Sequence, residues 1–297
     1  MIKLTPQSND DRALYNSIAA KKHKKNNHCS QCQDKTQCDT CKFSNRFKMQ
    51  SLSEYIFSRY DTYERQKDKL ETIVPDGQIS KDEEELLRDA YNNSTDFKAA
   101  RKLIMDSLPR GMKGKCPFCM ISEPNTLDHY FSETKYPEFI IYSPNLVPCC
   151  SNCNTLKGDE ILIGGHRTAL HYYYDPIPAE QFIFAKIAID GGIPSVSFDV
   201  KTDGCGEIGI VITNQFTRLK LAGRYEQQCN DVLSSLHDEM RELYEGDNSV
   251  DFCIKVLNTR IKSLENRCGK NYWKVCLYKA LSFDGKILQE FLETEFP

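Results

Sequence analysis

The feature that most constrains this chain is a set of four C-x-x-C pairs. A C-x-x-C turn places two thiolates on the same side of the chain, and two such turns complete a tetrahedral zinc site. The four pairs therefore predict two structural Zn²⁺ sites. The central site is expected from Cys116, Cys119, Cys150 and Cys153, and the N-terminal site from Cys29, Cys32, Cys38 and Cys41.

The cysteines leave two questions open. Cys149 competes with Cys150 as a ligand, although only Cys150 has C-x-x-C spacing to Cys153. The N-terminal group can hold zinc, an iron–sulfur cluster or no ion. Six of the 14 cysteines lie outside the pairs and show no ligand spacing. Most of these six are expected to be buried as small hydrophobic residues.

Length and composition describe an ordinary globular protein. The 297 residues correspond to about two domains, and 40% hydrophobic and 27% charged residues exclude a mainly disordered chain. No run approaches roughly 18 apolar residues, so we expect no membrane span and no membrane partner. The first residues lack the apolar region of a secretion signal. We therefore expect a cytoplasmic protein, whose cysteines bind metal instead of forming disulfides.

The patterns along the chain predict a mainly helical α+β protein in three parts. Residues 1–110 form a basic segment with the first cysteine cluster and then helices, because apolar residues recur at helical spacing over residues 51–108. Residues 111–175 carry the second cluster. Residues 176–297 begin with a predicted β-hairpin around Asp190-Gly191-Gly192 and a strand over residues 207–213, and they continue as helices from Phe216.

A basic run in the first part has two interpretations. Lys21–Lys25 holds four lysines around His23. Such a cluster suits contact with phosphate, and it equally suits a solvated helix end.

The second cluster encloses residues suited to metal-assisted chemistry. Asp128 and His129 follow an apolar residue, and Asn154 comes directly after the last cysteine, at the expected start of a helix. A carboxylate and an amide oxygen suit a hard divalent cation, and the neighbouring imidazole is then free to act as a base. His166 and His171 follow this helix and suit either contact with phosphate or the cation, or a surface or capped position.

These residues together resemble a known family. The order C-x2-C, D-H, N-L and C-x2-C-N-x2-K resembles the HNH endonucleases, also called ββα-metal or His-Me finger nucleases, in their four-cysteine zinc version. The matching residues lie within 116–159. The resemblance implies a central ββα-metal, treble-clef-like unit, flanked in this chain by the helical regions and the hairpin.

The resemblance also implies a role for each matching residue. His129 would be the general base, and Asp128 and Asn154 would hold one catalytic Mg²⁺ or Mn²⁺. Asn145 would accept a hydrogen bond from the His129 ring, and Lys157 would lie near the phosphate. One departure is that Ser132 and Glu133 stand where the family often has proline and a basic residue.

A looser resemblance concerns the biological setting. Residues 135–139 resemble HNH proteins that act with an ATPase in Septu-type antiphage defence, and residues 219–225 are similar to the helix after the HNH unit in such proteins. The implied function is a DNA endonuclease effector with an ATPase partner. RNA cleavage stays open, because the unit reads backbone geometry more than bases. The alternative is a non-catalytic zinc module that binds nucleic acid or a protein and does not need Asp128, His129 and Asn154.

Overall fold

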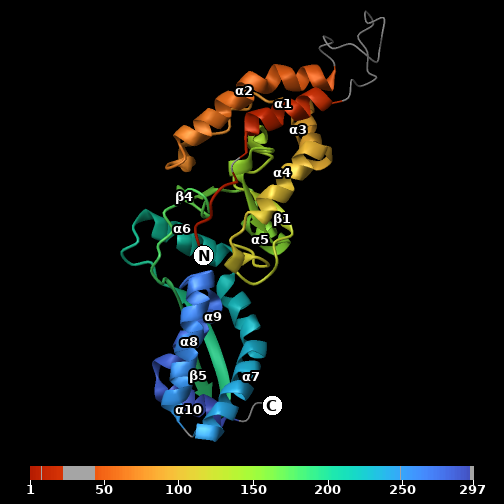
Figure 1. Cartoon of the computed structure of the whole chain (residues 1–297). Coiled ribbons are helices and arrows are strands. Elements are labelled where there is room, and N and C mark those ends of the chain that lie inside the picture. The colour runs from red at the N-terminus through yellow and green to blue at the C-terminus, as the bar shows by residue number, and fades with distance from the viewer. Residues whose placement is uncertain (8, 23–43, 248, 295–297) are drawn as a thin grey trace, which may run out of the picture.

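The computed structural model describes residues 1–7, 9–22, 44–247 and 249–294, which form an elongated, mainly helical α+β molecule (Figure 1). The α-helices are α1 (Asp11–Lys21), α2 (Asn45–Arg65), α3 (Lys81–Asn93), α4 (Thr95–Asp106), α5 (Ser151–Lys157), α6 (Glu207–Arg218), α7 (Leu221–Asp247), α8 (Val250–Cys268), α9 (Trp273–Phe283) and α10 (Gly285–Glu293). The strands are β1 (Thr126–His129), β2 (Leu146–Cys149), β3 (Leu162–Ile163), β4 (His166–Arg167), β5 (Ile183–Asp190) and β6 (Ile193–Val200).

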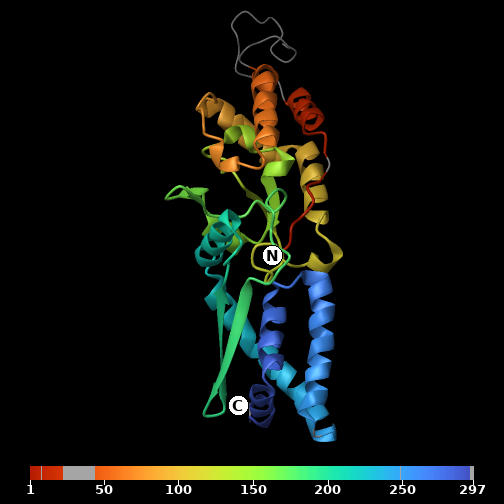
Figure 2. The same ribbon diagram turned by 90° about the vertical axis from the view of Figure 1, so that its left-hand side faces the viewer.

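One end of the molecule is built by the four N-terminal helices, with α1 beside α2 (Figures 1 and 2). The helices expected over residues 51–108 are confirmed as α2, α3 and α4. The start of α3 is fixed by a capping box, in which the Glu83 carboxylate accepts a hydrogen bond of 2.9 Å from the backbone N–H of Ser80. A buried stripe on α2 packs against the loops that follow β1, and it consists of Met49, Leu52, Ile56, Tyr60 and Tyr63.

The centre of the molecule is a two-stranded antiparallel sheet followed by a helix. Strand β1 pairs with β2, with Asp128 opposite Val147 and His129 opposite Leu146, and α5 begins two residues after β2 ends. Adjacent side chains of a strand point to opposite faces. Leu146 accordingly joins the core of the N-terminal helices, whereas Val147 joins the core of the C-terminal region. The central unit therefore lies between two hydrophobic cores and contributes to both.

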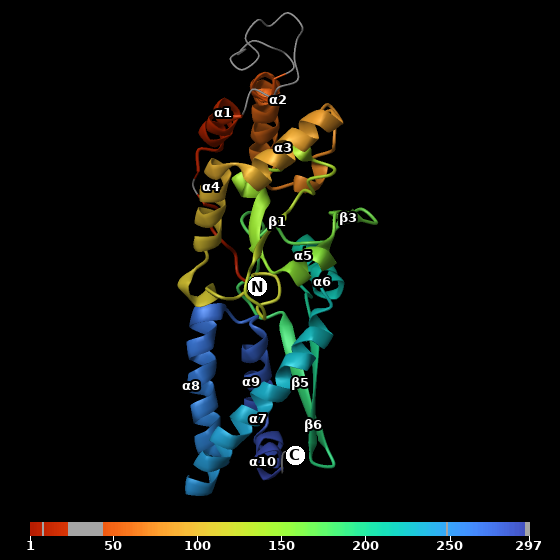
Figure 3. The same cartoon turned by 90° about the vertical axis from the view of Figure 1, so that its right-hand side faces the viewer.

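The other end combines the predicted hairpin with four helices. Strands β5 and β6 pair from Ile183↔Val200 to Asp190↔Ile193, which confirms the hairpin around Asp190-Gly191-Gly192. Helix α9 packs on β5 and α7 on β6, and α8 and α10 complete this end (Figure 3). None of the helices in the described ranges combines the length and hydropathy that a bilayer-crossing segment needs.

The strand expected over residues 207–213 is wrong, because this segment forms the first half of α6. Its β-branched residues suggested a strand, but the buried positions are Val211, Ile212, Gln215 and Phe216. Residues 211, 212, 215 and 216 are one, three or four positions apart, which is the spacing of one helical face, and this face packs against the core. Packing against the core overrides the local preference of β-branched residues. The three-part division of the chain stays a prediction.

We expect Gly111→Ala to destabilise the protein through overpacking. A Cβ at Gly111 would overlap the backbone carbonyl of Arg267 at the end of α8. The Cβ is fixed by the backbone at position 111 and the carbonyl by the backbone at position 267, so a rotamer change cannot relieve the clash. We expect the free energy of unfolding to fall by about 1–3 kcal/mol. Thermal unfolding followed by circular dichroism measures the change.

The matched control is Gly223→Ala. Position 223 lies in α7, and a Cβ there meets no atom within 4 Å. Alanine is a better helix former than glycine, so the control is expected to be neutral or to gain up to about 1 kcal/mol. Equal unfolding temperatures for the two variants would show that the approach of residue 111 to α8 is not tight.

Candidate functional site

The four central cysteines form a buried cluster with the geometry of a metal site. The Sγ atoms of Cys116, Cys119, Cys150 and Cys153 all lie within 4.8 Å of one another, and the sulfurs of Cys119 and Cys150 are 3.9 Å apart. A tetrahedral Zn²⁺ with bonds of about 2.3 Å separates its sulfurs by about 3.8 Å. The donor set therefore fits one Zn²⁺, as the two C-x-x-C pairs predict.

Hydrogen-bond donors around the cluster favour thiolates, whereas burial of the sulfurs disfavours them. The backbone N–H of Cys150 donates to Sγ of Cys116 over 3.3 Å, and Nη1 of Arg224 lies 3.3 Å from Sγ of Cys153. Burial raises the pKa of the Cys116 thiol to about 12, so a bound cation is what would hold these sulfurs in the thiolate form. Arg224 comes from α7, and this helix is thereby tied to the cluster.

The remaining cysteines lie apart from this cluster. The sulfur of Cys149 approaches that of Cys116 to 4.0 Å, but it donates to the carbonyl of Cys150 over 3.3 Å and is not one of the four clustered sulfurs. Cys205 is half-buried. The others in the described ranges are buried, as expected, and are Cys229, Cys253, Cys268 and Cys276. The predicted N-terminal site of Cys29, Cys32, Cys38 and Cys41 lies outside the described residues.

The cluster fixes the element that carries Asn154. Cys150 is the N-cap of α5 and Cys153 lies in its first turn, so two of the four sulfurs belong to the start of this helix. The helix begins at Ser151, earlier than the expected start at Asn154. It packs beside β1, which ends at His129. A cavity of about 270 Å³ opens between them and is lined by Asp128, His129, Ser132, Glu133, Asn154, Thr155, Gly158 and Asp159.

Asp128 has one occupied and one unoccupied carboxylate oxygen. Its side chain is 2% exposed, and Oδ1 lies 3.1 Å from Nζ of Lys157. Oδ2 is buried and has no hydrogen-bond partner among the described residues. Buried polar atoms nearly always have a partner, so an orphaned carboxylate oxygen on a residue that lines a cavity indicates a position for a water molecule or a cation.

Lys157 lies inside the protein, although the resemblance implied a position near phosphate. Its side chain is 3% exposed, and Nζ donates to the carbonyl oxygens of His129 (2.8 Å) and Tyr130 (3.3 Å) as well as pairing with Asp128. All three donors of the ammonium group are thus engaged. In this arrangement Lys157 neutralises Asp128 and clamps the end of β1.

The ring of His129 is held in one tautomer. Its Nε2 lies 3.0 Å from the carbonyl oxygen of Ile140. A carbonyl only accepts, so Nε2 carries the proton and the neutral ring presents an unprotonated Nδ1. The pKa of this imidazole is lowered to about 4, mainly by burial and also by the charges of Lys157 and Arg88, which together outweigh the raising effects of the Ile140 carbonyl and of Asp128. The ring is therefore neutral near pH 7.

Asn145 acts on the loop after β1 instead of on the imidazole. Its Oδ1 accepts from the N–H of Phe131 over 2.8 Å, and Nδ2 donates to the carbonyls of Phe131 (3.1 Å) and Phe139 (3.2 Å). The expected bond to the His129 ring is not among the contacts of the described residues. Since Ile140 follows Phe139 directly, Asn145 fixes the segment whose carbonyl holds the ring.

Sequence reasoning missed Tyr63, which connects α2 to this network. Its hydroxyl lies 3.3 Å from Oδ1 of Asn145 and 2.9 Å from Nε2 of His171. His171 is fully buried, stacks on Tyr174 with ring centroids 4.6 Å apart, and has its pKa lowered to about 3 by burial. It is therefore a core residue, while His166 is exposed on β4. The helical stripe marks Tyr63 only as a core residue, and no local pattern marks its contacts with the site, because its partners lie more than 80 positions away.

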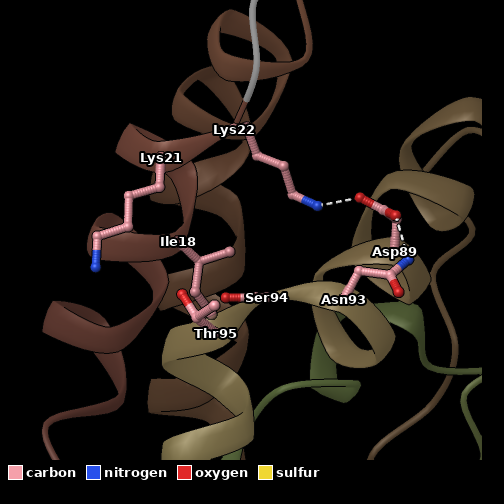
Figure 4. A pocket seen from close by; sticks show the side chains of 7 residues that line it. All are labelled: Ile18, Lys21, Lys22, Asp89, Asn93, Ser94 and Thr95. Atoms are coloured by element: carbon pink, nitrogen blue, oxygen red, sulfur yellow. Dashed lines mark hydrogen bonds and ion pairs between the residues drawn. The ribbon is translucent and has the colours of Figure 1, made fainter.

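Two positions of the basic run lie at a second cavity, of about 350 Å³, between α1, α3 and α4 (Figure 4). Lys21 pairs with Asp96 at 2.6 Å, and Lys22 pairs with Asp89. Both ammonium groups are thus matched by carboxylates, as at a solvated helix end. The rest of Lys21–Lys25 lies outside the described residues.

Comparison with known proteins shows a distant relationship. Over 235 residues the chain is 25% identical to Protein ea31 of Escherichia phage lambda, and this similarity spans 74% of the chain and 78% of that protein. No protein-family model and no solved structure matches. The aligned region of 235 residues is much longer than residues 116–159, so it includes parts of the chain outside the HNH-like signature.

We expect Cys119→Ser to remove one equivalent of zinc. The substitution leaves three sulfur ligands, and zinc metal analysis of the purified full chain reports the stoichiometry. Cys205→Ser is the control, because Cys205 is half-buried and is not part of the cluster. The same zinc content in both variants would contradict the site.

Proposed function

We propose that this chain is a metal-dependent HNH endonuclease that hydrolyses phosphodiester bonds of DNA. The observation that carries the proposal is the orphaned Oδ2 of Asp128, which belongs to a residue lining the same cavity as His129 and Asn154. These residues sit on a strand pair and a helix that the cysteine cluster holds together. Asp128, His129 and Asn154 are the residues to which the HNH resemblance assigns the metal and the base, whereas Asn145 and Lys157 make other contacts than the resemblance implies.

The cavity suits a hard divalent cation. Asp128 offers a carboxylate oxygen without a partner, and Asn154 offers an amide oxygen from the neighbouring helix. Oxygen donors of this kind are preferred by Mg²⁺ and Mn²⁺. When bound, such an ion supplies charge stabilisation for the phosphate oxygens and the departing 3′ oxygen.

The residues of the chain perform the proton transfer. Nδ1 of neutral His129 takes a proton from a water molecule whose oxygen attacks phosphorus, while the bond from phosphorus to the 3′ oxygen breaks. Ile140 keeps the imidazole turned with Nδ1 as the acceptor, since its carbonyl holds the opposite N–H. Lys157 balances the charge of Asp128 and fixes the backbone on which His129 stands.

We further propose that the nuclease works with an ATPase partner in antiphage defence in the cytoplasm. The support is the looser resemblance of residues 135–139 and 219–225 to HNH proteins of Septu-type pairs. The net charge of −3 also favours a partner-directed enzyme over one that binds nucleic acid through a broad basic face. A pull-down with the full chain from the native host tests this part separately: we expect an ATPase among the retained proteins, and its absence would contradict the partner.

Two other functions are distinguished by the same site. A zinc module that only binds has no use for a buried orphaned carboxylate beside an imidazole with an available lone pair. An RNA nuclease would use the same residues, so parallel reactions on plasmid DNA and on single-stranded RNA separate the two substrates.

We expect wild type with Mg²⁺ or Mn²⁺ to nick or cut plasmid DNA. His129→Ala removes the base, and a positioned base contributes about 10²–10⁴-fold to rate, so we expect a loss of at least that size. His166→Ala is the matched control, because His166 is exposed on β4 and does not line the cavity. Wild-type rates for His129→Ala would remove this residue from the mechanism.

We expect Asp128→Asn and Asn154→Ala to raise the Mn²⁺ concentration that gives half-maximal cleavage. Each substitution weakens one of the two proposed oxygen ligands. Asn152→Ala is the control, because Asn152 is an exposed residue of the same helix. Zinc content and unfolding temperature verify that the variants fold, and unchanged Mn²⁺ dependence would overturn the assignment of the cation site.

A further inference from the structure

We propose that the corner between α6 and α7, which carries Arg218 and Lys220, binds the phosphate backbone of the nucleic acid and seats it over the cavity. The inference rests on the proposed function and adds the surface that holds the substrate.

The cavity itself has no positive side chain to hold a phosphate. Among the described residues that line it, the ionisable members are Asp128, His129, Glu133 and Asp159, and none is a lysine or arginine. Lys157 is buried and its ammonium group is fully engaged. A polyanionic backbone therefore needs positive charge from an element at the rim.

Arg218 reaches this rim from the last turn of α6. Its Nε donates to the carbonyl of Leu156 in α5 over 3.3 Å. A Cβ placed on Gly158, a residue that lines the cavity, would lie 3.4 Å from Nη2 of Arg218. The guanidinium of Arg218 therefore lies beside Gly158 at the cavity wall. Within the described ranges, Arg218 has no carboxylate within ion-pair distance, and Glu160, whose pKa its charge helps to lower, is paired with Lys135 at 2.6 Å. The positive charge of Arg218 is therefore open to a ligand.

Lys220 extends the positive charge around the corner. It follows α6, is exposed, and adopts a left-handed backbone conformation with φ of 52° at the junction with α7. No carboxylate pairs with it in the described part of the chain. It lines a cavity of about 440 Å³ together with the start of α7. Helix α6 packs beside α5, the helix that carries Asn154 at the cavity (Figure 3).

Arg88, another arginine near the cavity, differs from Arg218 because carboxylates already pair with it. Arg88 of α3 donates to Glu133, which lines the cavity, and through Nη2 to Glu84 over 2.7 Å. Two carboxylates thus match one guanidinium. This pairing makes Arg88 a comparison residue, because it is close to the cavity but already neutralised.

The test measures how salt weakens binding of a short fluorescein-labelled DNA duplex. All variants carry His129→Ala, so that the duplex stays intact, and Mg²⁺ is kept constant. Each phosphate contact contributes about 0.9 to the slope of log affinity against log salt concentration. We expect the double variant Arg218→Ala, Lys220→Ala to reduce the slope by about 1.8, and Arg88→Ala to leave it unchanged.

A conservative variant separates charge from structure. Arg218→Lys keeps the positive charge but loses the planar guanidinium that contacts Leu156, so it is expected to keep the slope. An unchanged slope for the double variant overturns the proposal. A reduced slope that is seen only with Arg88→Ala overturns it as well. If wild type cleaves DNA while the double variant keeps the slope, only this surface fails. If the slope falls while wild type cleaves nothing, the surface stands and the endonuclease proposal fails.

Discussion

The contact between two C-x-x-C turns governs the arrangement of the centre of this protein. Cys116 and Cys119 belong to a loop before β1, while Cys150 and Cys153 belong to the first turn of α5. Their sulfurs converge within 4.8 Å, so the beginning and the end of the unit are held together. A helix of seven residues has little stability of its own in water. Its position beside β1, and hence the position of Asn154, depends on this cluster.

Charge inside the unit is balanced before any ligand enters. Lys157 sits against Asp128, and both side chains are almost completely buried. Removing either partner would leave an uncompensated buried charge, which is strongly destabilising. The pair leaves Oδ2 of Asp128 unmatched, and the surrounding backbone offers it no donor in the described structure. The fold thus tolerates one unsatisfied buried oxygen at the point where the proposed chemistry needs a ligand.

Much of this arrangement could be predicted from sequence, for reasons that are local. C-x-x-C spacing, helical periodicity and the glycine turn at 191–192 each involve neighbours along the chain, and they correctly indicated the cysteine cluster, α2 to α4 and the β5–β6 hairpin. The strand predicted over residues 207–213 is instead the first half of α6, because burial of one helical face outweighs the strand preference of its β-branched residues. Long-range contacts gave no such signal. The partners of Asn145, the burial of Lys157 and the part played by Tyr63 follow only from three-dimensional packing.

The position of β2 between the two cores couples the ends of the molecule to its centre. Leu146 is packed with the N-terminal helices and Val147 with the C-terminal region, although the two residues are adjacent. Tyr63 of α2 holds Asn145 from one side, and Arg224 of α7 holds Cys153 from the other. The cavity is therefore anchored to both ends of the molecule, while the cysteine cluster and the ion pair between Lys157 and Asp128 hold its strand and its helix to each other. A change at either end would have to strain these ties before it altered the spacing of Asp128 and Asn154.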